Sequence, residues 1–174
     1  MSTQPSTRAW YDVGMVQSVR AVLWGIFLAV GIGALVVFGI IWPVFEALFG
    51  RELASTALPV GIVVFAAAFA FYYGGMIGAY KAPSRRRVHG VMVGVTSFAI
   101  SPLLNLGASA LTANANDPFA NLRTPGTMLV TGVLFVVILT TSYMGGRRGE
   151  SLHAHNEKAT RVRERRRYRE GSES

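Results

Sequence analysis

Four long apolar runs without a charged side chain constrain this chain more than any other feature; they cover residues 21–42, 57–80, 88–113 and 126–146. A transmembrane helix needs about 20 apolar residues to cross a hydrocarbon core of about 30 Å, and each run meets that length. A transmembrane β-barrel would instead need alternating segments of about 10 residues. The sequence therefore predicts an all-α integral membrane protein, a bundle of four transmembrane helices.

The basic residues predict how this bundle is oriented. Two precede the first run, four fill the link between the second and third runs, and nine follow the fourth run. The two remaining connections hold only Arg51 and Arg123. Because Lys and Arg are retained on the cytoplasmic side, we expect both termini and the central link there, in the plasma membrane of a prokaryotic cell. The net charge of +8 is largely this topology signal.

The same pattern divides the chain into three parts. Residues 1–20 form a cytoplasmic lead-in, 21–146 the transmembrane domain, and 147–174 a basic cytoplasmic tail. Pro43 closes the first run, since proline lacks the amide hydrogen that a helix interior needs. The tail has nine cations and five acidic residues but few apolar ones. We expect it to extend the fourth helix and then to fray into disorder.

Small residues at four-residue spacing mark the faces through which the helices pack. Lipid tails are as apolar as leucine, so close backbone approach must hold transmembrane helices together. The stripes are either intramolecular packing faces, or one of them, on the first helix, is a homo-oligomer face. The predicted packing residues are Gly25, Ala29, Gly33, Ala66, Ala70, Gly74, Gly78, Gly90 and Gly94.

The third run carries a row of polar residues along one slowly drifting face. Proline within the row frees a backbone carbonyl that a neighbouring hydroxyl can satisfy. The row is either a hydrogen-bonded seam inside the bundle or the lining of a narrow polar path or pocket. This polar seam consists of Ser97, Ser101, Pro102, Asn105 and Ser109.

Several classes of function lack the residues that they need. No Asp, Glu, Lys, Arg or His lies in the middle of a run, which argues against proton-coupled transport and against recognition of charged substrates. Cysteine is absent, and His89, His153 and His155 have no pattern of metal ligands around them, so we interpret them as surface residues. We expect no enzyme and no catalytic, cofactor or metal site.

Clustered arginines near the cytoplasmic face predict contact with anionic lipid headgroups, at about 1 kcal/mol per cation near the surface. The alternative is that they serve only as a topology anchor and for solubility. We expect no nucleic-acid partner, since Tyr168 is the sole aromatic in the tail. The predicted lipid-contact residues are Arg85, Arg86, Arg87, Arg163, Arg165, Arg166 and Arg167.

Two glycine pairs indicate an internal repeat. Tyr73-Gly74-Gly75 is followed by Lys81, and Tyr143-Met144-Gly145-Gly146 is followed by Arg147 and Arg148. Both pairs are interpreted as the cytoplasmic end of the second helix of a hairpin. The chain would then be two helical hairpins of the same orientation, a parallel repeat.

The central stretch GGMIGAYKAPSRRRVHGVMVG, residues 74–94, resembles a segment of the YrzE-like group of small four-helix prokaryotic membrane proteins. The shared features are a Gly-Gly helix end, a short basic turn and a His-Gly-x-x-x-Gly helix start, here Gly74, Gly75, His89, Gly90 and Gly94. The resemblance implies a four-span bundle in the cell membrane and brings no established activity.

Two functions from different classes fit these observations. The first is a non-enzymatic accessory or scaffold subunit that recognises a membrane-protein partner, or a second copy of itself, through its helices or the cytoplasmic link. The second is a small oligomeric channel or transporter that uses the polar face of the third helix. The first predicts no flux through liposomes, and the second predicts leakage that depends on Asn105.

Overall fold

The computed structural model describes residues 7–50, 60–111 and 125–172, and almost all of these are helical. The elements are α1 (Thr7–Ala34), a π-helical segment (Leu35–Ile41), α2 (Trp42–Phe49), α4 (Val60–Lys81), α5 (Arg86–Leu111) and α6 (Pro125–Ser172). The prediction of an all-α chain is therefore confirmed for the described residues. Side chains are described from Gly14 onward, with a further gap from 102 to 124 and smaller ones elsewhere.

The first helix does not end at Pro43, contrary to the sequence prediction. α1, the π-helical segment and α2 follow one another without a break as far as Phe49. Proline has no amide hydrogen and clashes with the carbonyl four residues back in an α-helix. Here the amide of Trp42 donates to the carbonyl of Val37, five residues earlier, so a π-helical turn precedes Pro43 and the helix continues.

Three stretches of helix are long and apolar enough to cross a membrane: Gly14–Phe49, Gly61–Lys81 and Met128–Arg165. They include three of the four predicted runs. The third predicted run, 88–113, lies mostly in α5, whose described side chains end at Ser101. The predicted start of the second run, at residue 57, and the predicted end of the third run, at residue 113, fall outside the described residues.

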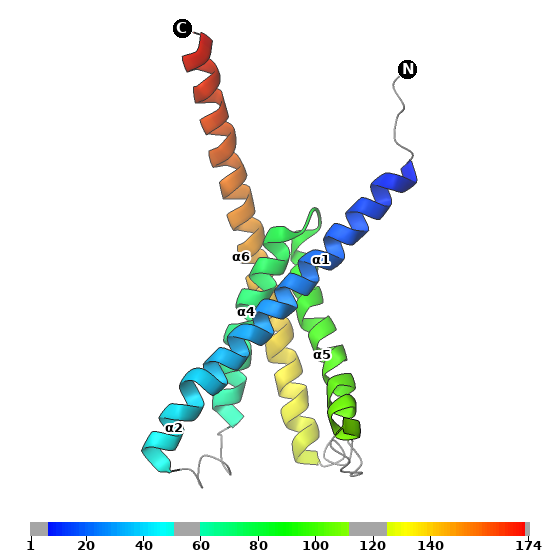
Figure 1. The fold of residues 1–174 in the computed structure, drawn as a ribbon, viewed down its shortest axis with the longest axis vertical. Coiled ribbons are helices and arrows are strands. Elements are labelled where there is room, and N and C mark those ends of the chain that lie inside the picture. Colours follow the sequence, from blue (N-terminus) through cyan, green and yellow to red (C-terminus); the bar gives the residue numbers. More distant parts are fainter. Residues whose placement is uncertain (1–6, 51–59, 112–124, 173–174) are drawn as a thin grey trace.

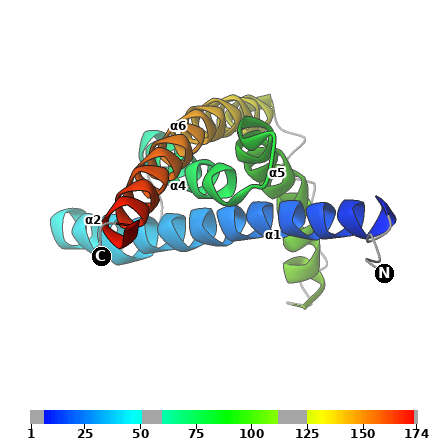
Figure 2. The same ribbon diagram turned by 90° about the horizontal axis from the view of Figure 1, so that it is seen from above.

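The helices cross one another near the middle of the molecule and splay apart on either side (Figure 1). The N-terminal part of α1, the link between α4 and α5, and the C-terminal part of α6 all lie at one end, which is the upper end in Figure 1. Seen from above, α4 lies between α1 and α6, and α5 crosses α1 (Figure 2). The three most basic segments of the chain thus share one end of the bundle.

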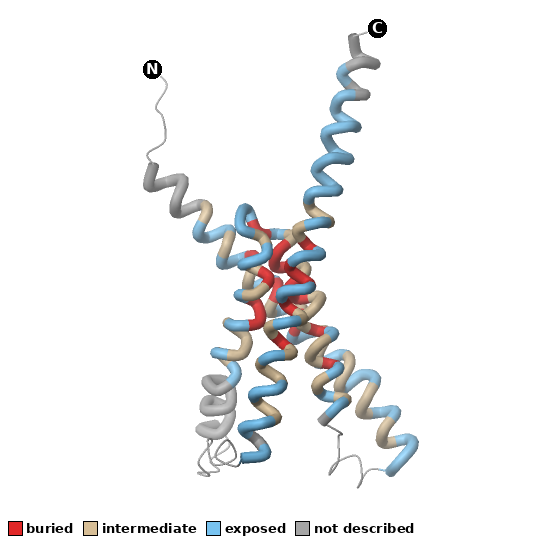
Figure 3. The backbone as a smooth tube through the Cα atoms, turned by 180° about the vertical axis from the view of Figure 1, so that it is seen from behind, coloured by how far each residue is buried: buried red, intermediate tan, exposed pale blue. Residues whose placement is uncertain are grey.

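The buried core is small and consists mainly of residues with little or no side chain. It is concentrated where the helices cross (Figure 3). The largest fully buried side chains are those of Val93 and Ser142, and most of the other buried residues are alanine or glycine. Large apolar side chains point outward instead; Phe27 and Phe38 are each 70% exposed. This is the pattern expected of helices that meet through their backbones and face lipid outside.

Candidate functional site

Among the described glycines, the closest backbone contacts between helices are those between α4 and α6. A methyl group on Gly145 would overlap the carbonyl of Tyr72, and one on Gly149 would overlap the carbonyl of Met76. A methyl group on Gly75 would likewise overlap the carbonyl of Ser142. We call these three glycines, Gly75, Gly145 and Gly149, the glycine crossing.

α1 packs on the other face of α4 through the predicted stripe. A Cβ atom on Gly25 would lie 2.7 Å from the carbonyl oxygen of Gly74, and one on Gly74 would lie 2.7 Å from the Cβ of Ala29. A Cβ atom on Gly33 would lie 3.6 Å from the Cβ of Ala70, which is an ordinary contact distance. The stripe on the first helix thus packs within one chain in this structure, as the first of the two interpretations predicts.

α5 packs on α6 through its own small residues. A Cβ atom on Gly90 would lie 2.6 Å from the Cα of Gly146, and one on Gly94 would lie 2.8 Å from the hydroxyl oxygen of Ser142. Each member of the predicted packing set is therefore buried or close to another helix. Ala66, for example, is only 1% exposed.

Sequence reasoning misplaced the two glycine pairs, because it interpreted them as helix ends. α4 continues beyond Gly75 to Lys81, and α6 continues beyond Gly146 to Ser172. The packing roles of Gly75 and of the α6 glycines were consequently missed. A signal was present: the pattern Tyr-x-Gly-Gly-x-x-Gly occurs at residues 72–78 and again at 143–149.

The polar seam is only partly within the described side chains. Ser97 has a buried hydroxyl without a hydrogen-bond partner, and Ser101 is exposed. Pro102, Asn105 and Ser109 belong to α5, which passes through the proline as a helix, but their side chains lie outside the description. The structure adds one polar residue that the sequence did not single out, Ser142 on α6, whose hydroxyl is also buried and without a partner.

Removing the hydroxyl of Ser142 should stabilise the fold. A buried polar group without a hydrogen bond costs about 1–3 kcal/mol, so we expect Ser142→Ala to raise the free energy of unfolding by about 1 kcal/mol. Unfolding of the purified protein in detergent micelles measures this. Ser142→Val is the control, because Ser142 packs beside Gly75 and Gly94 and a branched valine side chain there should destabilise the bundle. Destabilisation by Ser142→Ala would mean that the hydroxyl has a partner.

At the basic end of the bundle, side chains from three helices join α6 to the link. Nη2 of Arg86 lies 2.7 Å from Nε2 of His153, and the His153 ring meets the Tyr80 ring edge-on at 5.5 Å between centroids. The side-chain amide of Asn156 donates to the hydroxyl of Tyr80 at 3.0 Å. Because the guanidinium of Arg86 can only donate, Nε2 of His153 accepts this bond.

Arg87 completes this cluster, which we call the α4–α5–α6 clamp. Its Nε donates to a carboxylate oxygen of Glu150 in a close ion pair. This hydrogen bond, and secondarily the charge of Glu150, raises the pKa of the Arg87 guanidinium. Because the pair is solvent-exposed, it adds little to the free energy of unfolding. Its main role is to fix how α5 and α6 meet.

Because of the clamp, the three arginines of the basic link have different surroundings. Arg86 and Arg87 contact α6, whereas Arg85 is exposed and adopts a left-handed backbone conformation with φ of 43°. His153 is half-buried in the clamp, so interpreting it as a plain surface residue was incomplete. Nδ1 of His89 lies 3.2 Å from the carbonyl oxygen of Arg85, and His155 is exposed. Among the described residues, no group of three or more His, Cys, Asp or Glu side chains could hold a metal ion.

Beyond Gly146, α6 continues as a helical arm, residues 147–172, which points away from the bundle (Figure 1). At 1.5 Å per residue, Arg163 lies about 25 Å along the helix axis from Gly146. Arg163 and Arg165 are exposed, and the side chains of Arg166 and Arg167 are not described. The tail was predicted to extend the fourth helix and then to fray into disorder; it does extend the helix, and it is helical as far as Ser172.

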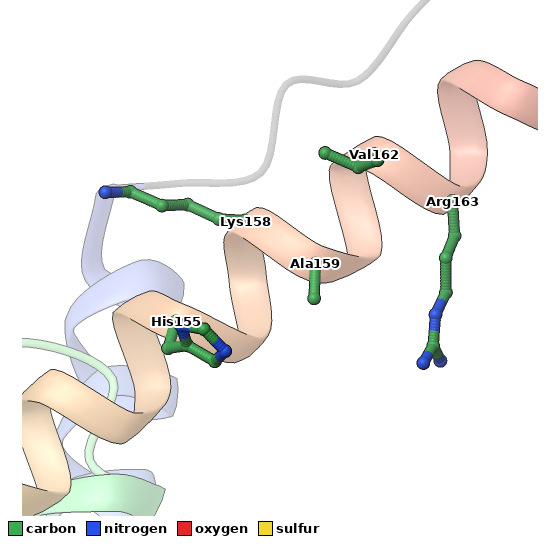
Figure 4. A pocket seen from close by; sticks show the side chains of 5 residues that line it. All are labelled: His155, Lys158, Ala159, Val162 and Arg163. Carbon is green, nitrogen blue, oxygen red and sulfur yellow. The ribbon is translucent and has the colours of Figure 1, made fainter.

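An open hollow of about 410 Å³ lies along one face of this arm, and Figure 4 shows the side chains that line it. All of its lining residues come from α6, so it is an open helix face and not an enclosed ligand cavity. Its centre is apolar and its borders are basic. The lining residues are His155, Lys158, Ala159, Val162 and Arg163.

No family model, curated protein or solved structure matches this chain. The resemblance of residues 74–94 to the YrzE-like group therefore stays a prediction.

Proposed function

We propose that this protein is a non-enzymatic accessory or scaffold subunit of a prokaryotic plasma membrane. It is a four-span bundle with both termini in the cytoplasm, and it holds the helical arm of α6 at a fixed place above the membrane. The observation that carries this proposal is the glycine crossing, where α4 and α6 meet through their backbones. Such a crossing sets the position and direction of the arm rigidly.

The distribution of charge supports the membrane placement. The three basic segments lie at the same end of the bundle, as the retention of Lys and Arg in the cytoplasm requires (Figure 1). Outward-facing phenylalanines such as Phe27 and Phe65 lie on the stretches that are long enough to span a bilayer. α5 is the fourth span of this proposal.

The contacts also support two hairpins related by a parallel repeat. Gly145 of α6 meets Tyr72 of α4, and Gly149 of α6 meets Met76 of α4, so the two copies of the Tyr-x-Gly-Gly-x-x-Gly pattern contact each other. Each copy is also covered by the preceding helix of its own hairpin: α1 covers α4, and α5 covers α6.

The glycine crossing favours the scaffold over a pore within one chain. A polar path through the bundle needs room for at least a water molecule between helices. Between α4 and α6 there is no room even for a methyl group at three described positions. Of the two seam residues with described side chains, Ser97 has a buried hydroxyl and Ser101 is exposed, so they do not face a common path within one chain.

The helical arm is the surface that we propose for recognition of a partner. Its exposed apolar centre, Ala159 and Val162, is bordered by Lys158 and Arg163, which fits a cytoplasmic partner with an acidic amphipathic helix. For Arg163 and its neighbours to contact anionic headgroups, the arm would have to bend onto the membrane, since they lie well beyond a Debye length of about 8 Å. Lipid contact is more directly available to Arg85 at the link.

Adding acidic residues to the hollowed face should remove the partner. We expect the double variant Ala159→Glu and Val162→Glu to lose the protein that co-purifies with the full chain from native membranes, because it replaces apolar contact by like charge. Quantitative mass spectrometry of affinity-purified membranes measures this. The matched control is Thr160→Glu with Tyr168→Glu, which adds the same charge to exposed positions on the other side of the arm.

Two results would contradict the proposal. Equal loss of the co-purifying protein in both double variants would show that binding depends on net charge and not on the hollowed face. Solute or ion flux through liposomes that contain the purified protein, abolished by Asn105→Leu, would favour the oligomeric channel instead.

A further inference from the structure

A basic hollow lies where α1 passes the end of α4, away from the arm and the clamp. Its volume is about 340 Å³, and its lining contains two cations and one indole but no carboxylate. α1 contributes four residues spaced along one face, and the end of α4 with the following link contributes two. The lining residues are Gln17, Arg20, Ala21, Trp24, Lys81 and Pro83.

The indole of Trp24 and the ammonium of Lys81 tie the two helices together at this hollow. Nζ of Lys81 lies 4.3 Å from the centre of the Trp24 ring, a cation–π contact. The ammonium has three donors, and a contact with the ring face occupies only one direction. Lys81 and Arg20 are both exposed, so they can donate to an anion that enters the hollow.

A second, apolar hollow of about 330 Å³ continues from the first along α1. It is lined by Arg20, Leu23, Trp24 and Phe27, and it shares Arg20 and Trp24 with the basic hollow. Leu23 is 56% exposed and Phe27 is 70% exposed. From Arg20 to Phe27 this surface extends about 10 Å along the helix, away from the basic end and toward the middle of the bundle.

We infer that these two hollows together bind one anionic phospholipid from the cytoplasmic leaflet. The phosphate would lie between Arg20 and Lys81, and an acyl chain would lie along Leu23, Trp24 and Phe27. Basic pockets between transmembrane helices on the cytoplasmic side recognise anionic headgroups, and indole rings prefer the membrane interface. The inference rests on the proposed membrane placement, and it uses residues other than the arginine clusters predicted from the sequence.

Fluorescence of Trp24 tests this site, in a Trp10→Phe and Trp42→Phe background that leaves it as the only indole. The protein is placed in nanodiscs of phosphatidylcholine and phosphatidylglycerol in which one lipid carries brominated acyl chains. We expect brominated phosphatidylglycerol to quench Trp24 with an apparent preference of about 10- to 30-fold over brominated phosphatidylcholine, from two cations near the surface. Arg20→Gln with Lys81→Gln should reduce this preference to about that of the bulk lipid.

The matched control removes two cations from the arm, Arg161→Gln with Arg163→Gln, and should keep the preference. Equal quenching by the two lipids in the parent protein overturns the lipid site and leaves the membrane placement intact. Absence of quenching by either lipid overturns the placement as well. Loss of the preference on addition of inorganic phosphate would show that the hollow takes the free anion, which also overturns the inference. Phosphatidylcholine quenching of the double variant shows that it is still inserted.

Discussion

Alanine in place of Gly145 is expected to lower the free energy of unfolding by about 2–3 kcal/mol, although it adds one methyl group. The methyl carbon would overlap the carbonyl of Tyr72, which belongs to the α4 backbone and cannot rotate away as a side chain would. α4 and α6 would have to move apart, and the contacts of Gly75 and Gly149 would loosen with them. Unfolding in mixed detergent micelles, followed by circular dichroism, measures the change.

Gly132→Ala on the same helix is the matched control. No atom lies within 4 Å of the Cβ position there, so the added methyl group meets open space. Because glycine is less favourable than alanine inside a helix by about 0.5–1 kcal/mol, this variant should be neutral or slightly more stable. Opposite signs for the same substitution on one helix would locate the effect at the crossing. Similar stabilities for the two variants would mean that α4 and α6 do not meet at Gly145.

The packing faces could be predicted because they depend on local spacing alone. Four-residue intervals place small residues on one side of a helix whatever the partner is, so Gly25, Ala29 and Gly74 were found without knowing what they touch. The roles of Gly75 and Gly145 were missed for a different reason. The glycine pairs were interpreted as the cytoplasmic ends of hairpin helices, so Gly75 and Gly145 were not considered as packing residues.

The arm illustrates the same point. Hydropathy reports where the solvent changes, whereas a helix ends only where the backbone loses its hydrogen bonds. Residues 147–172 contain no proline, so α6 continues as a helix beyond the end of the apolar run. Pro43 had the opposite effect on the prediction: its position suggested an end, and a π-helical turn accommodates it instead.

The clamp and the basic hollow could not be predicted from one sequence. Arg87 and Glu150 are 63 residues apart, and Arg86 and His153 are 67 residues apart. Such pairs depend on the register of α5 against α6, which the backbone contacts at Gly90 and Gly94 determine. Likewise, Lys81 reaches Trp24 only because α1 crosses α4 at Gly25 and Gly74. Periodicity in the sequence predicts which face of a helix packs. The register of one helix against another can be read only from the contacts in the three-dimensional structure.

Removing the four cations of the central link should disturb the orientation of the bundle more than any other change of equal charge. The variant replaces Lys81, Arg85, Arg86 and Arg87 by glutamine. At about 1 kcal/mol per cation near an anionic surface, these residues together favour the cytoplasmic side by about 4 kcal/mol. Reporter fusions at residues 50 and 120 should be external and one at residue 84 cytoplasmic in the parent protein. In the variant, we expect the reporter at residue 84 to be divided between the two sides.

The arm supplies the control for this experiment, because it allows the same loss of charge at a distance from the bilayer. Arg163, Arg165, Arg166 and Arg167 lie 17 to 21 residues beyond Gly146, at the limit of the 15–20 residues over which cations influence orientation. Their replacement by glutamine should leave all three reporters in place. A change of orientation in this control would mean that total charge and not position decides the topology. A cytoplasmic reporter at residue 50 or 120 in the parent protein would contradict the four-span arrangement itself, and with it the placement of the arm above the membrane.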